Sequence, residues 1–128
     1  MINNYLALIE SEIKSMKFGA RPKSLYEPIH YIMRLGGKRL RPLLTMLAYS
    51  LYKNDATRIV PIAVTVEAFH NFTLMHDDIM DNAPLRRGKP SVHEKWNVNT
   101  AIISGDVMLA KVYEQFLKPT TGRWLGLV

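Results

Sequence analysis

Apolar side chains recur along most of the chain at the three- and four-residue spacing of amphipathic helices. The first such stripe is formed by Ile2, Leu6, Ile9, Ile13 and Met16. Further helices are predicted over residues 28–36, 42–54, 56–81 (with a kink near Pro61) and 91–117. No stretch alternates as a strand does. The sequence therefore predicts an all-α fold.

The same spacing predicts which side chains face inward. On the helix expected over 42–54, the inward-facing residues are Leu43, Leu44, Leu47 and Leu51. The helix expected over 56–81 has few charges, and its inward-facing residues include Phe69. Residues 82–90 are predicted to be a loop from their proline and glycine content. Ser91 and Glu94 have the spacing of a capping box, which predicts that the last helix begins there.

Composition narrows the class of protein. The chain has 128 residues, no cysteine, and 17 Lys+Arg against 11 Asp+Glu, for a net charge of +6. The lack of cysteine excludes disulfides and thiolate zinc sites. No apolar run approaches the ~20 residues that span a bilayer, so we expect a soluble, cytoplasmic protein without membrane insertion. The positive charge favours an anionic partner, which could be nucleic acid, a lipid surface or a phosphorylated small molecule.

An acidic motif, Asp77-Asp78-Ile79-Met80-Asp81, ends the long apolar segment. Asp77 and Asp81 share a helix face, and like charges at this spacing, near the negative end of a helix, are unfavourable. The nearest upstream cation is Arg58. A bound divalent cation would compensate, and carboxylate oxygens favour Mg²⁺. The alternative is a solvated acidic helix end, which would not need the surrounding apolar residues.

Two cationic turns accompany this motif. Lys38, Arg39 and Arg41 stand between one predicted helix and the start of the next, where free N–H groups attract anions. Arg86 and Arg87 follow Asp81 closely and suit bidentate phosphate binding. The first turn could instead be a basic turn in solvent, and the second could be a loop whose charges neutralise the aspartates. Taken with a metal site, they favour a diphosphate that bridges Mg²⁺ and arginine.

His70 lies seven residues before Asp77, so both face a similar direction on one helix. A lone histidine on an apolar helix can be a core residue whose polar atoms are satisfied locally. Beside the cationic turns, it could equally donate a hydrogen bond to a diphosphate.

Three segments together resemble the trans-prenyl (polyprenyl) diphosphate synthase family, which includes farnesyl and geranylgeranyl diphosphate synthases. They are GGKRLRP at 36–42, VEAFHNFTLMHDDIMD at 66–81 and LRRGKPSVHEKW at 85–96. The resemblance covers about residues 20–117. It implies a partial isoprenoid-synthase bundle, about five to six helices of a larger all-α barrel, with residues 1–117 as the N-terminal part of the domain. Such a part would expose apolar faces.

The resemblance also implies a reaction. Mg²⁺ and arginine neutralise the leaving diphosphate of an allylic substrate, and isopentenyl diphosphate attacks the resulting carbocation, extending the chain by five carbons. In the family pattern, Asp77 and Asp81 bind Mg²⁺ with support from Asp78, and Arg86 holds the allylic diphosphate. Isopentenyl diphosphate would be bound by Lys38, Arg41, His70 and Arg87. Length control falls on Phe72 and Thr73, and a bulky Phe72 predicts a C15–C20 product.

The sequence departs from the family pattern after Asp81. A second aspartate-rich motif is missing, since only Asp106, Glu94 and Glu114 follow. Residues 118–128 do not continue the helical pattern, so we expect a truncated or frame-shifted product of a family that forms homodimers. One alternative is an inactive helical fragment that binds diphosphate or pairs with a missing half.

Two further alternatives come from other classes. A nucleic-acid binder would show a continuous basic stripe with interleaved aromatic residues, whereas these cations lie in two turns. A class I terpene cyclase also uses an aspartate motif, but would not need the turn at 36–42 for a second diphosphate.

Overall fold

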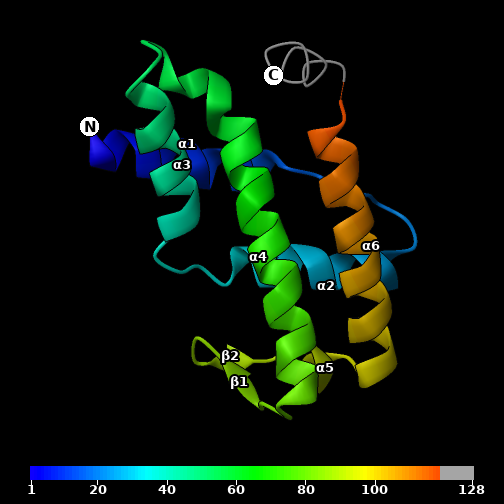
Figure 1. Ribbon diagram of the computed structural model, residues 1–128. Coiled ribbons are helices and arrows are strands. Elements are labelled where there is room, and N and C mark those ends of the chain that lie inside the picture. The colour runs from blue at the N-terminus through cyan, green and yellow to red at the C-terminus, as the bar shows by residue number, and fades with distance from the viewer. Residues whose placement is uncertain (119–128) are drawn as a thin grey trace.

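The computed structural model describes residues 1–118, which form helices almost throughout (Figure 1). The helices are α1 (Ile2–Ser15), α2 (Lys23–Arg34), α3 (Leu40–Ser50), a 3₁₀ turn η1 (Ala56–Ile59), α4 (Val60–Met80), α5 (Val92–Lys95) and α6 (Val98–Phe116). Two short strands, β1 (Leu85–Arg86) and β2 (Lys89–Pro90), pair antiparallel in a hairpin. The all-α prediction is confirmed.

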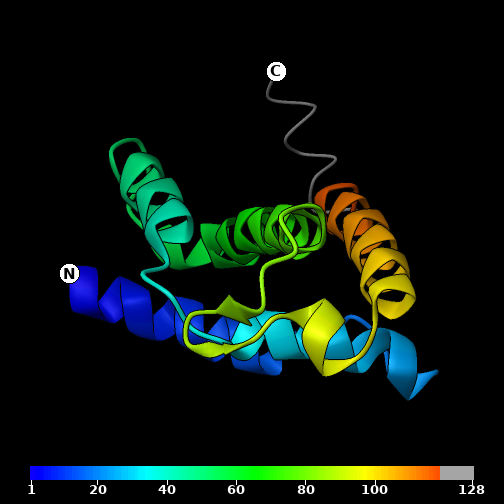
Figure 2. The same ribbon diagram turned by 90° about the horizontal axis from the view of Figure 1, so that it is seen from below.

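Helix α4 is the centre of the fold because it packs against α1, α2, α3 and α6. Seen from below, α3, α4 and α6 form one layer, and α1 and α2 form a second layer beneath it (Figure 2). Fully buried side chains from both layers make the core, among them Ile9, Ile29, Ile32, Met46, Val64 and Met108. The hairpin and α5 lie at the end of α4 that carries the acidic motif.

Two helices begin earlier in the chain than predicted. Helix α2 begins at Lys23, five residues before Pro28, so Pro28 lies inside the helix. Pro28 is buried in the core, and this burial offsets the hydrogen bond that a proline cannot donate. Helix α3 begins at Leu40, which leaves Pro42 in the first turn, where a missing N–H costs little.

The segment 82–96 was the least well predicted. The expected loop contains the β1–β2 hairpin, and two-residue strands are too short to show an alternating pattern. A helix does begin at the predicted place, because Ser91 is the N-cap residue of α5. Its side chain makes no capping hydrogen bond, since the Ser91 hydroxyl donates to the carbonyl of Ala83 at 2.6 Å. The predicted final helix is two helices, and Asn97 caps the second by accepting a hydrogen bond from the Thr100 N–H at 2.7 Å.

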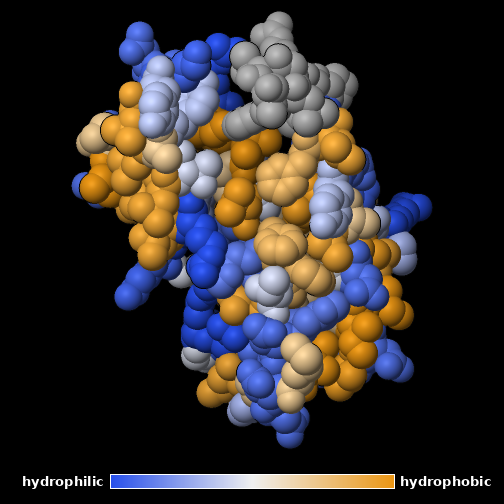
Figure 3. All heavy atoms as spheres, in the orientation of Figure 1, coloured by the Kyte–Doolittle hydropathy of each residue, from blue (hydrophilic) through white to orange (hydrophobic). Residues whose placement is uncertain are grey.

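Several apolar side chains predicted to face inward are exposed. Leu44 and Leu51 of the α3 region are 54% and 78% exposed, and Phe69 of α4 is exposed as well. Helix α3 packs mainly against α4, η1 and α1, and its Leu40 and Leu44 stay more than half exposed. Figure 3 shows apolar side chains gathered on the α3 side of this face. The expected exposure of apolar faces is therefore present.

Two other expectations concern the membrane and the end of the chain. Within residues 1–118, every helix is too short or too polar to cross a bilayer. The predicted change of pattern over 118–128 lies outside the described residues, apart from Lys118.

Candidate functional site

The turn that joins α2 to α3 has an unusual backbone. Gly36 and Gly37 have φ values of 88° and 128°, and Arg39, which caps α3, has a φ of 52°. The left-handed conformation costs a non-glycine residue about 1–2 kcal/mol. It places neighbouring residues in opposite directions, so Lys38 and Arg41 are exposed while Arg39 is buried.

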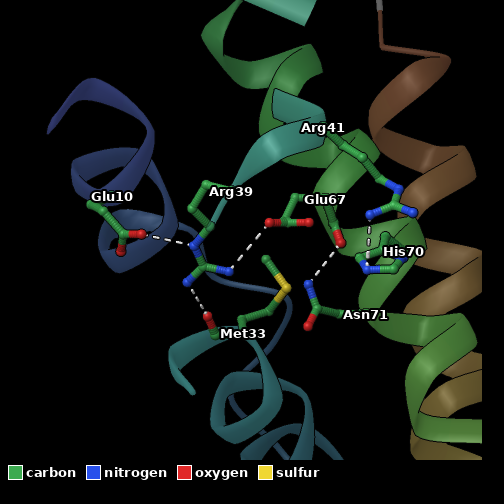
Figure 4. Close-up of polar contacts among 7 residues, drawn as sticks. All are labelled: Glu10, Met33, Arg39, Arg41, Glu67, His70 and Asn71. Atoms are coloured by element: carbon green, nitrogen blue, oxygen red, sulfur yellow. Dashed lines mark hydrogen bonds and ion pairs between the residues drawn. The ribbon is translucent and has the colours of Figure 1, made fainter. Parts of the chain in front are cut away.

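Arg39 is a structural residue that the sequence analysis had grouped with the anion-binding cations. It is 3% exposed and contacts three helices (Figure 4). Its Nε donates to Glu10 Oε1 at 2.7 Å, its Nη2 to the Met33 carbonyl at 2.7 Å, and its Nη1 to Glu67 Oε2 at 3.4 Å. Glu67 is the one carboxylate in the apolar stretch of α4 that precedes the acidic motif, and this was the signal in the sequence that a buried cation accompanies it.

Arg41 and His70 meet beside this turn. Arg41 Nη1 lies 3.1 Å from His70 Nε2 (Figure 4). Arginine has only donors, so Nε2 of His70 accepts and the proton of the neutral ring sits on Nδ1. The pKa of His70 is lowered, first by burial and then by the positive charge of Arg41. The histidine is therefore neutral at pH 7 and keeps one N–H for a further partner.

The second cationic turn reaches the first through Arg87. A Cβ atom placed on Gly37 would lie 2.9 Å from Arg87 Cζ, so the guanidinium rests against the glycine. Like Arg39, Arg87 is left-handed, with a φ of 53°. Its pKa is lowered by burial and by the charge of Arg39, whereas Glu67 acts in the opposite direction. Arg41, His70 and Arg87 thus belong to one cationic cluster, to which the exposed Lys38 is adjacent in sequence.

The three aspartates of the acidic motif have different surroundings. Asp78 is 3% exposed and accepts two hydrogen bonds from Arg86, from Nη2 at 2.6 Å and from Nε at 3.0 Å. Asp77 and Asp81 are exposed, and within residues 1–118 their carboxylates have no hydrogen bond or ion pair. For Asp78, the structure therefore bears out the alternative that the second cationic turn neutralises an aspartate, because Arg86 compensates its charge. The hydrogen bond to Asp78 raises the pKa of Arg86.

The chemistry of the remaining donors suits magnesium. Asp77 and Asp81 are one helical turn apart on the same face of α4, with both carboxylates accessible. Mg²⁺ is commonly held by one or two carboxylates, with water and phosphate oxygens completing the octahedron. Among residues 1–118, no three or more acidic or histidine side chains are grouped to hold a metal by themselves. Asp77 and Asp81 could supply two ligands to such an ion, with phosphate and water oxygens supplying the others.

Phe72 and Thr73 lie half-buried on α4 between the cationic cluster and the aspartates. The Phe72 ring packs between Phe69 and His76, at centroid distances of 5.8 Å and 4.9 Å. The Thr73 hydroxyl donates to the carbonyl of His70 at 2.6 Å. Both positions therefore lie beside the aspartates, Phe72 with a bulky ring.

Both the sequence and the fold of this chain match known proteins. The family model for polyprenyl synthetase matches residues 22–125, which is most of the chain. The chain belongs to the polyprenyl synthetase family. Its structure also superimposes on family members, with a TM-score of 0.85 and 51% identity to a geranylgeranyl pyrophosphate synthase crystal structure over 91% of this chain and 36% of that one. The crystal structure of geranylgeranyl pyrophosphate synthetase from Pyrococcus horikoshii superimposes with a TM-score of 0.82 and 37% identity, over 91% of this chain and 36% of that one.

Relatives found by sequence also belong to the polyprenyl synthetase family. The chain is 42% identical to a geranylgeranyl diphosphate synthase of Methanosarcina mazei over 88% of this chain and 35% of that protein. It is 44% identical to a geranylgeranyl diphosphate synthase of Saccharolobus solfataricus over 89% and 33%. The chain therefore spans about a third of the length of these relatives. The predicted resemblance is confirmed, and the isoprenoid-synthase fold with it.

Proposed function

We propose that this chain carries the diphosphate-binding part of a prenyl diphosphate synthase, which condenses isopentenyl diphosphate with an allylic diphosphate in isoprenoid biosynthesis. The observation that carries the proposal is the cluster of Arg41 from α3, His70 from α4 and Arg87 from the hairpin turn, beside the C-terminal end of α4 with Asp77 and its C-cap Asp81. Positive donors and accessible carboxylates on one strip of surface suit a metal-bound diphosphate. Relatives named as geranylgeranyl and short chain isoprenyl diphosphate synthases support the reaction class.

The cationic cluster and Lys38 would bind isopentenyl diphosphate. Arg41 donates to the ring of His70, which orients the histidine so that its Nδ1–H is available to a phosphate oxygen. Arg87, held against Gly37, adds a planar fork of donors. Arg39 acts through its neighbours: by anchoring the turn in the core, it positions Lys38 and Arg41.

Asp77 and Asp81 would hold Mg²⁺, and Arg86 would contact the allylic diphosphate. When bound, Mg²⁺ supplies positive charge that stabilises the leaving diphosphate. Asp78 is engaged by Arg86, so its direct coordination of a metal requires the exchange of that ion pair. We therefore assign Asp78 first to the orientation of Arg86 and second to the metal.

Chain length is proposed to depend on Phe72 and Thr73. The bulky Phe72 ring favours a C15–C20 product, consistent with the relatives' names. In product analysis, Phe72→Ala should shift the distribution to longer chains, with Leu117→Ala as a control. An unchanged distribution in an active enzyme would remove Phe72 from this role.

We further propose that residues 1–117 are the N-terminal part of a cytoplasmic synthase that acts as a homodimer. A second candidate function is a fragment that binds diphosphate without turnover, or that pairs with a complementary half. It is favoured by the exposed apolar side chains of α3 and α6, including Leu44 and Ile103.

Calorimetry and a product assay test these proposals together. We expect the chain to bind geranyl diphosphate more tightly with Mg²⁺ than without it. Asp77→Asn with Asp81→Asn should abolish the Mg²⁺-dependent gain, whereas Glu114→Gln, an exposed carboxylate on α6, should not. Longer prenyl products after addition of isopentenyl diphosphate would demonstrate the enzyme, and binding without products would favour the second candidate. No binding with or without Mg²⁺ would overturn both.

A further inference from the structure

An open surface pocket of about 570 Å³, called the cavity below, lies between α2, β2 and α5, next to the hairpin in which its Lys89 pairs with Arg86. Its lining shares no residue with the cationic cluster or the aspartates. Pockets for small molecules commonly have volumes of about 300–1,000 Å³. The size of this cavity therefore suits a small organic molecule.

The cavity is lined by more positive than negative charge. Arg34, Lys89 and Lys95 contribute three cations, against the single carboxylate of Glu27. Within residues 1–118, none of these three cations forms an ion pair. All three cations are exposed to solvent and line the same pocket, so an anion bound among them would be attracted by each.

The remaining wall is aromatic and apolar. Tyr31 and Trp96 pack edge to face at 5.2 Å, and Lys95 Nζ lies 4.5 Å from the centre of the Tyr31 ring. Leu35 and Pro90 complete this side. The ammonium group of Lys95 is thereby held at the boundary between the charged and the apolar wall.

The walls are also fixed to one another. The Tyr31 hydroxyl donates to the Pro90 carbonyl at 2.6 Å, which ties α2 to the hairpin. His30, which lines the cavity too, has a lowered pKa because of burial and the charge of Arg34. It is neutral at pH 7, so the positive charge of the cavity comes from the arginine and the lysines.

We propose that this cavity is a second binding site, for an organic phosphate. Arg34, Lys89 and Lys95 would hold the phosphate, and the organic part would pack against Leu35 and Trp96. The site goes beyond the proposed synthase function and does not depend on it. Its ligand could carry a planar ring or an aliphatic chain, since both fit an aromatic and apolar wall.

Trp96 provides a local readout, because Trp124 is the only other tryptophan of the sequence. We would titrate the Trp124→Phe chain without Mg²⁺ with three probes that share a diphosphate: inorganic diphosphate, ADP and geranyl diphosphate. A saturable change in Trp96 fluorescence with ADP or geranyl diphosphate, tighter than with inorganic diphosphate, is expected. The tighter of the two identifies a ring or a chain. No saturable change with any probe would overturn the proposal.

Charge variants then locate the response. Replacing Arg34 and Lys95 together with glutamine should weaken binding about tenfold or more, as expected for the loss of two charge-assisted contacts. Lys53→Gln removes an exposed charge elsewhere and should leave the affinity unchanged. Arg41→Gln should also leave it unchanged. If Arg41→Gln abolished the response, or Lys53→Gln weakened it equally, the proposal would be wrong. Circular dichroism would verify that each variant is folded.

Discussion

The two cationic turns, 36–42 and 85–90, are built alike but are held with different strength. In each, one arginine points inward to a buried carboxylate of α4, Arg39 to Glu67 and Arg86 to Asp78. In each, a cation nearby stays available, Arg41 in the first turn and Arg87 in the second. Each turn also contains a left-handed arginine.

The difference lies in the anchors. Arg39 has three partners on α1, α2 and α4, and its side chain is almost completely buried. Arg86 has one partner, and 26% of its side chain is exposed. The first turn is therefore a fixed part of the core. The second can exchange its ion pair for a ligand, as binding of an allylic diphosphate by Arg86 would require.

The largest loss of stability is expected from Arg39→Met, which removes the contacts that anchor the first turn in the core. Glu67 would be left buried without its cation, and loss of one partner from a buried pair costs about 3–5 kcal/mol of unfolding free energy. Urea denaturation measures this loss. Adding Glu67→Leu to Arg39→Met should recover much of it, because no buried charge then remains. A single variant as stable as the parent chain would show that Arg39 anchors nothing.

Substitution of Arg86, the anchor of the second turn, should lower the free energy of unfolding less than substitution of Arg39. Arg86→Gln leaves Asp78 buried and is expected to destabilise the chain by about 2 kcal/mol, since water can reach part of the site. The neighbouring Arg87→Gln, which breaks no ion pair, should cost less than about 0.5 kcal/mol and serves as the control. Equal effects of the two variants in urea denaturation would contradict the assigned difference between them.

Gly37→Ala tests whether the turns depend on each other. The left-handed backbone would cost alanine about 1–2 kcal/mol, and its Cβ would displace the Arg87 guanidinium. Affinity for inorganic diphosphate, measured by calorimetry, should fall. Gly36→Ala carries a similar strain but meets no atom within 4 Å, so its effect should be confined to stability. A loss of affinity in both variants would mean that strain, not contact, is responsible.

The smallest change in stability is expected when the pH is lowered and His70 takes up a proton. The His70 pKa lies below its usual value, owing to burial and Arg41, with smaller effects of Arg87 and Arg86 and an opposing one of Glu67. The unfolded chain therefore takes up a proton at a higher pH than the folded chain, and stability falls as pH drops through about 6.5. Because the ring is partly exposed, we expect this dependence of stability on pH to be smaller than the effects of the variants above.

An NMR titration of the histidine ring signals checks this. Arg41→Gln should raise the His70 pKa towards its usual value, whereas Arg58→Gln, on η1, should not. A His70 pKa that is the same in the parent chain and in Arg41→Gln would contradict the contact between the two side chains.

Much of the fold could be predicted because it depends on local pattern. The three-and-four spacing of Ile2 to Met16 places one helix, and the spacing over 56–81 places another, since a helix needs only its own backbone partners. The hairpin was missed because its strands have only two residues each, which is too short for an alternating pattern to show. Leu44 and Leu51 were misjudged because spacing describes a face, while burial depends on what lies opposite it.

The candidate site could also be predicted only in part from the sequence. Residue types and spacing alone indicated Asp77, Asp81 and the two cationic turns, because paired carboxylates and grouped cations are unfavourable without a ligand. They could not separate Arg39 from Arg41, or Asp78 from Asp77. Neighbouring residues of the same type differ only in the direction that the backbone gives them, and in these turns that direction depends on left-handed residues.

By itself, the sequence determined the helical class, the family, and the kind of chemistry that its charges favour. Only the tertiary structure decided which charges are structural: Arg39 and Asp78 are neutralised inside the protein, whereas Arg41, Asp77 and Asp81 stay accessible to a ligand. The physical reason is that burying a charge is costly without a partner, and the partners, Glu67 and Arg86, come from elements that only folding brings beside them.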